Sequence, residues 1–369
     1  MRILVTGGAG FVGSHLVDAL VERGHPVRVL DNLEAQVHQG QRPSYLNERA
    51  DYLFGDVRDR PLLHRALTGV DVVFHEAAVV GVGQSMYQIE KYLSANVLGT
   101  GILLETLISE RLPLKKLIVA SSMSLYGEGQ YRCRACGPVA PSLRTDEQLQ
   151  ARRWEMHCPH CQGEVLAEAT TEEKPLAPTS VYAVSKRDQE ELCLSVGRSY
   201  KIPTVALRYF NVYGPRQALS NPYTGVCAIF SARLKHGRRP LIFEDGRQSR
   251  DFVHVSDVVQ ANLLAMEDAR ADGQVLNVGT GQPVTVLEIA QTLSALYGVP
   301  VQPQVTQKYR TGDIRHCYAD VTKIRAVGFR PAVALEDGLR DLVAWGKGQA
   351  AEDRVEAATQ ELEARGLTQ

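Results

Sequence analysis

The chain has 369 residues, 44% of them hydrophobic, and its 41 lysines and arginines against 42 aspartates and glutamates leave a formal net charge of −1 at pH 7. The length allows one large or two medium domains with real cores, and the balanced charge gives no bulk field that would recruit nucleic acid or a membrane, so we expect neither as a partner. The N-terminal apolar run is too short for a signal peptide, and no stretch approaches the roughly 18 apolar residues of a membrane span, so we expect a cytoplasmic protein.

The first predicted element is a short apolar strand, Ile3–Thr6, which runs into a glycine-punctuated turn and then a helical stretch from Ser14. Three glycines at this spacing suit a backbone that turns tightly, approaches a pyrophosphate and packs a helix on a sheet. Glycines also mark ordinary strand-to-helix turns, but the strand before and the helix after favour dinucleotide binding. The residues expected to bind the dinucleotide here are Gly7, Gly10, Phe11, Val12 and Gly13.

Strands and helices then alternate through the first half, which predicts an α/β protein with a doubly wound, Rossmann-type parallel sheet. The expected strands are Ile3–Thr6, Val27–Leu30, Tyr52–Gly55, Val70–Glu76, Leu117–Ser121 and Thr204–Arg208. The expected helices are Ser14–Arg23, Arg60–Leu67, Gln88–Glu110 and Tyr182–Tyr200, followed in the second half by Val226–His236 and Val286–Tyr297. Such sheets bind ligands outside the carboxyl ends of their strands.

This pattern divides the chain into a dinucleotide-binding domain at 1–210, with an insert at about 130–164, and a smaller substrate domain at 211–348. Some segments of the second domain are expected to return to the first. We expect 349–369 to be a solvated helix or a frayed tail, with no assigned function, because it is charged and alanine-rich.

Asp31 ends the second predicted strand, eighteen positions after Gly13. A carboxylate there can accept hydrogen bonds from an adenosine ribose and would repel a 2′-phosphate, so NAD is favoured over NADP. The alternative is a simple turn aspartate. Polar or small residues at this and the neighbouring strand ends are expected to line the same cofactor crevice: Asn32, Asp56, Val57, Ala77 and Ala78.

A serine-rich strand end containing Ser122 is followed much later by Tyr182-Ala183-Val184-Ser185-Lys186. Tyrosine and lysine four apart share one helix face, and an ammonium close to a phenol lowers the pKa of the phenol. A serine can hydrogen-bond the hydroxyl that the tyrosine deprotonates. This combination predicts acid–base chemistry on an alcohol, with hydride transfer to a nicotinamide.

With these motifs the chain resembles the extended short-chain dehydrogenases/reductases, in the branch acting on nucleotide-diphosphate sugars, from residue 1 to about 345 apart from the insert. The resemblance implies a catalytic set of Ser122, Tyr182 as the base and Lys186, with tightly bound NAD. It also implies cofactor contacts from Asn96, Tyr209, Tyr182 and Lys186. The segments Arg208–Pro215, Arg250–Asp257 and Arg310–Asp313 resemble those that bind the substrate diphosphate, where either arginine could instead form a structural ion pair. The implied substrate residues are Ser124, Asn211, Arg250, Arg310 and Asp313.

One departure narrows the reaction. The family's dehydratases carry an Asp-Glu pair after the catalytic hydroxyl residue, and here those positions are Met123 and Ser124. Neither side chain can serve as acid or base in an elimination, which leaves epimerisation, decarboxylation or simple redox.

We therefore expect an NAD-dependent 4-epimerase that works through a 4-keto sugar. The insert, Ser122–Gly127 and Ala218–Tyr223 are similar to bacterial dTDP-L-rhamnose 4-epimerases, which interconvert that sugar nucleotide with dTDP-6-deoxy-L-talose. UDP-glucose, UDP-N-acetylglucosamine or UDP-glucuronate remain alternative substrates. Other hypotheses are a net dehydrogenase or reductase and a non-catalytic NAD-binding scaffold. The helices at Gln88–Glu110 and Tyr182–Tyr200 resemble the family's dimer interface, so a homodimer is expected.

The insert falls within the 54 residues between Gly127 and Tyr182 and carries two Cys-x-x-Cys pairs. Four thiolates at this spacing are typical of a closed, structural zinc ribbon. Iron is the alternative metal, and His157 or His160 could replace a ligand in principle. We expect the insert to overhang the sugar pocket or a subunit interface. The expected zinc ligands are Cys133, Cys136, Cys158 and Cys161, whereas Cys193, Cys227 and Cys317 are expected to be small buried side chains.

Overall fold

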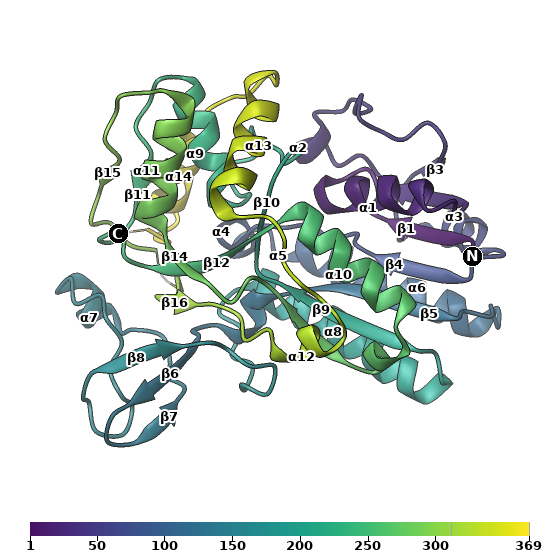
Figure 1. The fold of residues 1–369 in the computed structure, drawn as a ribbon, viewed down its shortest axis with the longest axis horizontal. Helices are drawn as coiled ribbons and strands as arrows, with labels where there is room; N and C mark the ends of the chain where they lie inside the picture. The colour runs from purple at the N-terminus through teal and green to yellow at the C-terminus, as the bar shows by residue number, and fades with distance from the viewer. Residues whose placement is uncertain (311, 369) are drawn as a thin grey trace.

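The computed structural model describes residues 1–310 and 312–368, and its body is a seven-stranded sheet (Figure 1). The strand order is β13-β9-β5-β4-β1-β2-β3, and all six pairings are parallel. The chain moves outward in opposite directions from β1, which creates the switch point where such sheets bind ligands. The strands are β1 (Ile3–Thr6), β2 (Val27–Asp31), β3 (Asp51–Phe54), β4 (Val72–His75), β5 (Lys116–Ser122), β9 (Thr204–Tyr209) and β13 (Val275–Val278). The predicted α/β class and the six predicted strands are confirmed.

Helices cover both faces because the strand residues alternate between two apolar cores. Ile3 and Val5 face the core under α1 (Phe11–Glu22) and α10 (Val255–Glu267). Leu4 faces the other core. The helices on that second face are α3 (Arg60–Leu67), α6 (Gly99–Ser109) and α8 (Val181–Tyr200). Short helical turns precede or follow them at α2 (Ala35–His38), α4 (Val82–Ser85), η2 (Met123–Tyr126), η3 (Ala269–Ala271) and α12 (Thr322–Ala326).

The long helix predicted at Gln88–Glu110 is interrupted. It consists of α5 (Ile89–Tyr92), a π-helical turn η1 (Leu93–Leu98) and α6. The buried side chain of Asn96 in η1 hydrogen-bonds the backbone of Val79, which holds the widened turn in place.

This same helical run corrects one expectation about membrane spans. Residues Ile89–Ser109 are long and apolar enough to cross a membrane by length and composition, with a mean hydropathy of 1.2. Half of the run is buried inside the fold, and a buried core helix passes the same test.

A second lobe follows the main sheet and carries its own core. A four-stranded sheet contains β10 (Asn211–Tyr213), β12 (Ser249–His254), β14 (Pro283–Thr285) and β16 (His316–Cys317), beside a two-stranded sheet of β11 (Leu241–Ile242) and β15 (Gln304–Val305). Its helices are α9 (Val226–Lys235), α11 (Val286–Tyr297) and α13 (Leu335–Lys347). The C-terminal segment forms α14 (Val355–Ala364), which buries Val355, Ala358 and Leu362. It is therefore packed and not frayed.

The insert folds as a small antiparallel sheet that projects from the body below β16 (Figure 1). Its strands are β6 (Gln130–Cys133), β7 (Gly137–Val139) and β8 (Val165–Glu168), with the short helix α7 (Asp146–Gln150) in the intervening loop. Tyr131, Val139 and Met156 form its minor apolar core with Cys133 and Cys158. A core this small suggests that the insert needs additional cross-links.

Candidate active site

A cavity of about 480 Å³ opens at the carboxyl ends of the central strands, at the switch point of the sheet. It brings together most of the residues singled out in the sequence. Those lining it are Gly7, Gly10, Phe11, Val12, Gly13, Asp31, Asn32, Asp56, Val57, Ala77, Ala78, Ser122, Ser124, Tyr182, Lys186, Tyr209 and Asn211.

The glycine loop has the geometry of an anion cradle. Gly7 has φ +72°, and a Cβ on Gly13 would lie 2.3 Å from the carbonyl oxygen of Gly7, so neither position tolerates a side chain. Helix α1 starts directly after Gly10, and its first intrahelical bond runs from Ser14 N to Gly10 O at 3.0 Å. The N–H groups that precede Ser14 in the helix therefore have no intrahelical acceptor, and they form the positive end of the helix dipole. This end can bind a phosphate.

Asp31 is the last residue of β2, as the sequence predicted. Its carboxylate accepts hydrogen bonds from Ala9 N at 2.9 Å and Leu33 N at 2.8 Å, which fix its orientation at the cavity wall. Asp56 lies nearby and accepts hydrogen bonds from Nε and Nη2 of Arg58, both at 2.7 Å. That pairing lowers the pKa of Asp56 to about 2, so the group is a carboxylate at neutral pH.

Ser122, Tyr182 and Lys186 come together from two elements. Ser122 ends β5, while the tyrosine and the lysine lie one turn apart at the start of α8, which Ser180 caps. Burial raises the pKa of Tyr182, and a hydrogen bond with the Ser122 hydroxyl lowers it. Ser124 donates to the same Ser122 oxygen at 2.9 Å. A hydroxyl-bearing ligand in this corner would meet both the phenol and the serine.

Lys186 makes no hydrogen bond to the phenol in the described part of the chain. Its ammonium group donates to the carbonyl oxygen of Ala120 and to Oε1 of Gln189 at 2.6 Å. Burial lowers the pKa of Lys186 itself to about 8.

A buried polar network holds Gln189 behind this lysine. Gln189 donates through Nε2 to Thr100 Oγ1 at 2.9 Å, and the Thr100 hydroxyl donates to Asn96 O at 2.6 Å. His75 lies between Thr6 and Thr100 at 2.8 Å from each. Burial lowers the pKa of His75 to about 3, so the ring is neutral. Because the Thr100 hydroxyl donates its proton to Asn96, its oxygen accepts from His75, which assigns the ring proton to Nε2. The network is rigid and carries no net charge.

Glu76 is a site residue that the sequence analysis missed. It follows β4 and lines the cavity, where burial raises the pKa of its carboxyl group to about 7. The Tyr209 hydroxyl donates to it at 2.8 Å. The available signal was a single acidic residue in the otherwise apolar stretch Val72–Ala78.

Four predicted residues do not line the cavity in the described part of the chain. Asn96, expected at the cofactor, is fully buried, and its side-chain amide hydrogen-bonds the backbone of Val79 and the hydroxyl of Ser185. It therefore stabilises the cavity-lining residue Val79 without lining the cavity itself. Arg250 donates to the carbonyl oxygens of Ile314 and Arg315. Arg310 lies over the Phe243 ring at 4.1 Å. Asp313 is the fourth, and Thr311 of its motif lies outside the described residues.

The four cysteines of the insert do converge. The sulfur atoms of Cys133, Cys136, Cys158 and Cys161 lie within 4.8 Å of one another. Tetrahedral zinc with Zn–S bonds of about 2.3 Å requires sulfurs roughly 3.8 Å apart, so the set fits that metal. The second pair forms a tight turn in which Gln162 N donates to Cys158 O and Cys158 N donates to Gly163 O, both at 2.9 Å. The lone cysteines Cys193, Cys227 and Cys317 are buried, as predicted.

A glycine loop at a helix N-terminus, a carboxylate at the end of β2 and a Ser–Tyr–Lys group in one cavity are the arrangement typical of short-chain dehydrogenase/reductase folds. Comparison with known proteins agrees. The chain belongs to the NAD dependent epimerase/dehydratase family, which matches residues 3–144 and 158–279. The unmatched stretch between these two ranges lies inside the insert.

Individual relatives are similar over nearly the whole chain. The dTDP-L-rhamnose 4-epimerase of Burkholderia thailandensis is 33% identical over 93% of this chain and 94% of its own. The putative UDP-glucose 4-epimerase of Methanocaldococcus jannaschii is also 33% identical, over 94% and 98%. Among solved structures, the UDP-glucose 4-epimerase of Thermotoga maritima with UDP-glucose is 33% identical with a TM-score of 0.76, over 94% of this chain and 98% of that one. The Thermus thermophilus UDP-glucose 4-epimerase with NAD is 30% identical with a TM-score of 0.75, over 95% and 100%.

Proposed function

We propose that the protein is an NAD-dependent 4-epimerase of a nucleotide-diphosphate sugar that works through a 4-keto intermediate. The observation that carries the proposal is the convergence of Tyr182, Ser122 and Lys186 on a cavity that also contains the glycine loop. Met123 and Ser124 occupy the positions of the dehydratase acid and base, which weighs against elimination. Most of the similar proteins named above are 4-epimerases.

The glycine loop, Asp31 and the wall at Ala77 and Ala78 would hold NAD. The N–H groups of the glycine loop suit the pyrophosphate, and the Asp31 carboxylate suits a ribose without a 2′-phosphate. Bound NAD would supply the chemistry of taking up a hydride from carbon 4 and returning it. No net redox change would follow, so the cofactor need not leave between turnovers.

The chain's own residues would move the proton. Tyr182 would accept the proton of the 4-hydroxyl and return it, while Ser122 orients that oxygen through its hydroxyl. Because burial raises the pKa of Tyr182, its ionised form needs positive charge at the cavity wall, which Lys186 supplies.

For the substrate we propose dTDP-L-rhamnose, converted to dTDP-6-deoxy-L-talose. The support is the similarity to a dTDP-L-rhamnose 4-epimerase, and a putative UDP-glucose 4-epimerase is similar to the same degree. Ser124 and Asn211 are proposed sugar-nucleotide contacts, and Oδ1 of Asn211 is buried without a hydrogen-bond partner among the described residues. Arg250 and Arg310 stay proposed diphosphate ligands, and Asp313 stays a proposed substrate contact.

A panel of nucleotide sugars, followed by NMR for inversion at carbon 4, tests this proposal. Inversion of dTDP-L-rhamnose by the purified protein without added cofactor is the expected result. Inversion of a UDP-hexose, UDP-N-acetylhexosamine or UDP-glucuronate alone would replace the substrate. Turnover only with added NADH or NADPH would indicate a net dehydrogenase or reductase, and no turnover of any compound would favour a scaffold.

We further propose that the four cysteines hold one structural zinc ion. The set leaves no open position for a substrate, so a catalytic role is not part of the proposal. Iron is the alternative occupant, and metal analysis separates the two.

A homodimer is proposed on the outer face of α5, η1, α6 and α8. Apolar side chains that a monomer would leave in water gather there, namely Met86, Ile89, Leu93, Leu98 and Val184. Exposed aliphatic side chains in one region mark an association surface.

A further inference from the structure

The insert contains a loop whose two ends meet at the cysteine cluster. We name residues 137–157 the insert loop, since one Cys-x-x-Cys pair precedes it and the other follows it. Most of it, 145–157, falls outside the family match. No described residue of the insert loop lines the cavity. Any influence on the reaction must therefore pass through the residues that the loop touches.

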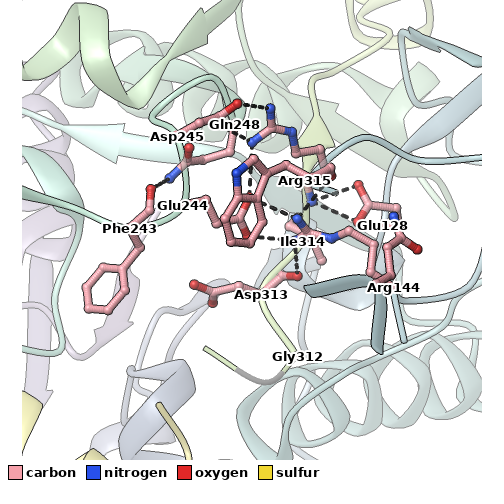
Figure 2. A network of polar contacts seen from close by, with 12 residues as sticks. Glu128, Arg144, Phe243, Glu244, Asp245, Gln248, Gly312, Asp313, Ile314 and Arg315 are labelled. Carbon is pink, nitrogen blue, oxygen red and sulfur yellow. Dashed lines mark hydrogen bonds and ion pairs between the residues drawn. The ribbon is translucent and has the colours of Figure 1, made fainter. Parts of the chain in front are cut away.

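The insert loop holds one segment of the second lobe, the described residues 309–310 and 312–316, which we name the 309–316 segment. Arg144 donates through one guanidinium nitrogen to Asp313 O at 3.0 Å, and it forms a two-point ion pair with Glu244 at 2.8 and 2.9 Å (Figure 2). The Arg144 and Glu244 side chains are 1% and 4% exposed. Trp154 of the loop packs on Tyr309, with ring centres 6.3 Å apart.

A second buried arginine continues this contact. Arg315 has a fully buried side chain that pairs with Glu244 at 3.0 Å, with Asp245 at 2.7 Å and with Glu155 of the insert loop at 2.5 Å. Its own backbone N–H donates to Glu128 (Figure 2). A buried guanidinium that loses a carboxylate partner keeps its charge, and an unpaired buried charge is strongly destabilising. Removing one member of this cluster is therefore expected to shift the others.

The 309–316 segment also contacts Arg250 and the chain just before α8. Arg250 donates to Ile314 O at 2.7 Å and to Arg315 O at 3.0 Å. Gly312 O accepts from Thr179 Oγ1 at 3.2 Å, three residues before Tyr182. This segment is thus held by the insert loop on one side and by the residues just before α8 on the other.

We infer that the insert loop is a positioning device for nucleotide-diphosphate binding. The four converging cysteines bring both ends of the loop together, so that Arg144 and Glu155 hold the 309–316 segment and its Arg310 in one place. Both are positioning residues, since neither lines the cavity. The inference rests on the proposed function, because it concerns the affinity of that same substrate site.

The decisive variant is Arg144→Met, which removes the ion pair and the bond to Asp313 O while keeping an unbranched side chain out to the ε position. The matched control is Arg153→Met, an exposed arginine of the same loop. Calorimetry with dTDP and UDP, and steady-state kinetics with the nucleotide sugar that the wild type turns over, are the measurements. Arg144→Met should raise Kd and KM by about tenfold or more, because the 309–316 segment then loses the buried Arg144 contacts that hold it in place. The value of kcat should change by less than about twofold, and bound NAD should not change, whereas Arg153→Met should match the wild type.

Two further variants separate positioning from general damage. Glu155→Gln changes a side chain that is 61% exposed, so it weakens the pair between the insert loop and Arg315 without disturbing a core. The KM should rise while kcat stays unchanged. Cys161→Ser should reproduce the KM increase together with loss of zinc, and its combination with Arg144→Met should add little to either single change.

Unchanged Kd and KM in Arg144→Met and Glu155→Gln would overturn the inference. Equal loss of kcat and NAD in both would also overturn it, because it would indicate a purely structural role. A wild type that binds neither dTDP nor UDP would instead overturn the proposed function, which keeps the two failures distinct.

Discussion

The carboxyl group of Glu76 and the ammonium group of Lys186 line the same cavity, and each shifts the pKa of the other. Burial is the main cause in both cases, and it raises the pKa of Glu76 to about 7 and lowers that of Lys186 to about 8. Their mutual attraction opposes both shifts. Two groups of opposite charge therefore titrate near neutral pH beside the proposed proton carrier, Tyr182.

This pair gives a signed pH prediction. Epimerisation should decline as pH rises through about 8, because Lys186 then loses the proton that supports ionised Tyr182. Glu76→Gln removes the negative charge that raises the pKa of Lys186, so the alkaline decline should move to lower pH. The measurement is kcat against pH for both proteins. Glu90→Gln, an exposed carboxyl on α5, serves as the control and should keep the wild-type profile. A profile of Glu76→Gln that coincides with it would contradict the prediction.

Tyr182→Phe should abolish turnover while leaving the cofactor in place. The ring still packs against Tyr92, 6.3 Å away between centres, so only the proton-carrying oxygen is lost. General acid–base groups contribute about 10²- to 10⁴-fold, and the rate should fall within or beyond that range. Single-turnover kinetics and the NAD content of the purified protein check both parts. Substantial residual epimerisation would show that another group carries the proton.

Metal loss should unfold the insert and spare the main sheet. Zinc binding to four thiolates contributes on the order of 10–16 kcal/mol in small zinc domains, and the insert has only a minor apolar core of its own. Elemental analysis should find one zinc per chain in the wild type and none in Cys133→Ala. Hydrogen exchange should then quicken in β6–β8 while β1, β4 and β5 stay protected. Cys193→Ala, a buried cysteine outside the cluster, should retain the metal. Iron in place of zinc would correct the metal, and retention of zinc by Cys133→Ala would refute the site.

Charge on the α5–α6 face should separate the proposed dimer. Leu98 and Ile89 are 54% and 48% exposed in the single chain, and glutamate at either position would place a charge in the interface. Sedimentation should show a dimer for the wild type and a monomer for Leu98→Glu. Leu166→Glu is the comparison, since that leucine is 65% exposed on β8 of the insert and away from this face. A monomeric wild type would rule the interface out.

Local pattern was enough for the cofactor half of the site. The strand–glycine–helix order around Gly7 and Gly13 and the alternation of strands fix the switch point, because strand ends in a parallel sheet meet at one edge. The spacing of Tyr182 and Lys186 predicts a shared helix face, and the structure has it. The direction of the lysine was not predictable, because it depends on Gln189 of the same helix, and Gln189 is held by Thr100, which the fold brings from α6.

Tertiary contacts account for what the sequence could not give. From the sequence alone, Glu76 would be predicted to be an ordinary ionised carboxylate. Its raised pKa follows only from its burial at the strand end beside the cavity. Arg250 carries a motif typical of diphosphate binding, yet here the backbone carbonyls of residues 314 and 315 occupy its guanidinium. The C-terminal tail appeared solvated because Val355, Ala358 and Leu362 are sparse, but their spacing forms one helix stripe that packs.

The register between β5 and β9 has a consequence for how this chain can change. Leu117–Ser122 pair with Thr204–Tyr209, and α8 packs on β5, so the sheet and the helix packed on it hold Ser122 and Tyr182 together. Among the described residues, none between 130 and 164 forms a hydrogen bond with Ser122 or Tyr182. Insertions there leave the proton-transfer pair undisturbed, which makes the connection a place where a new module can be acquired, altered or lost without rebuilding the chemistry.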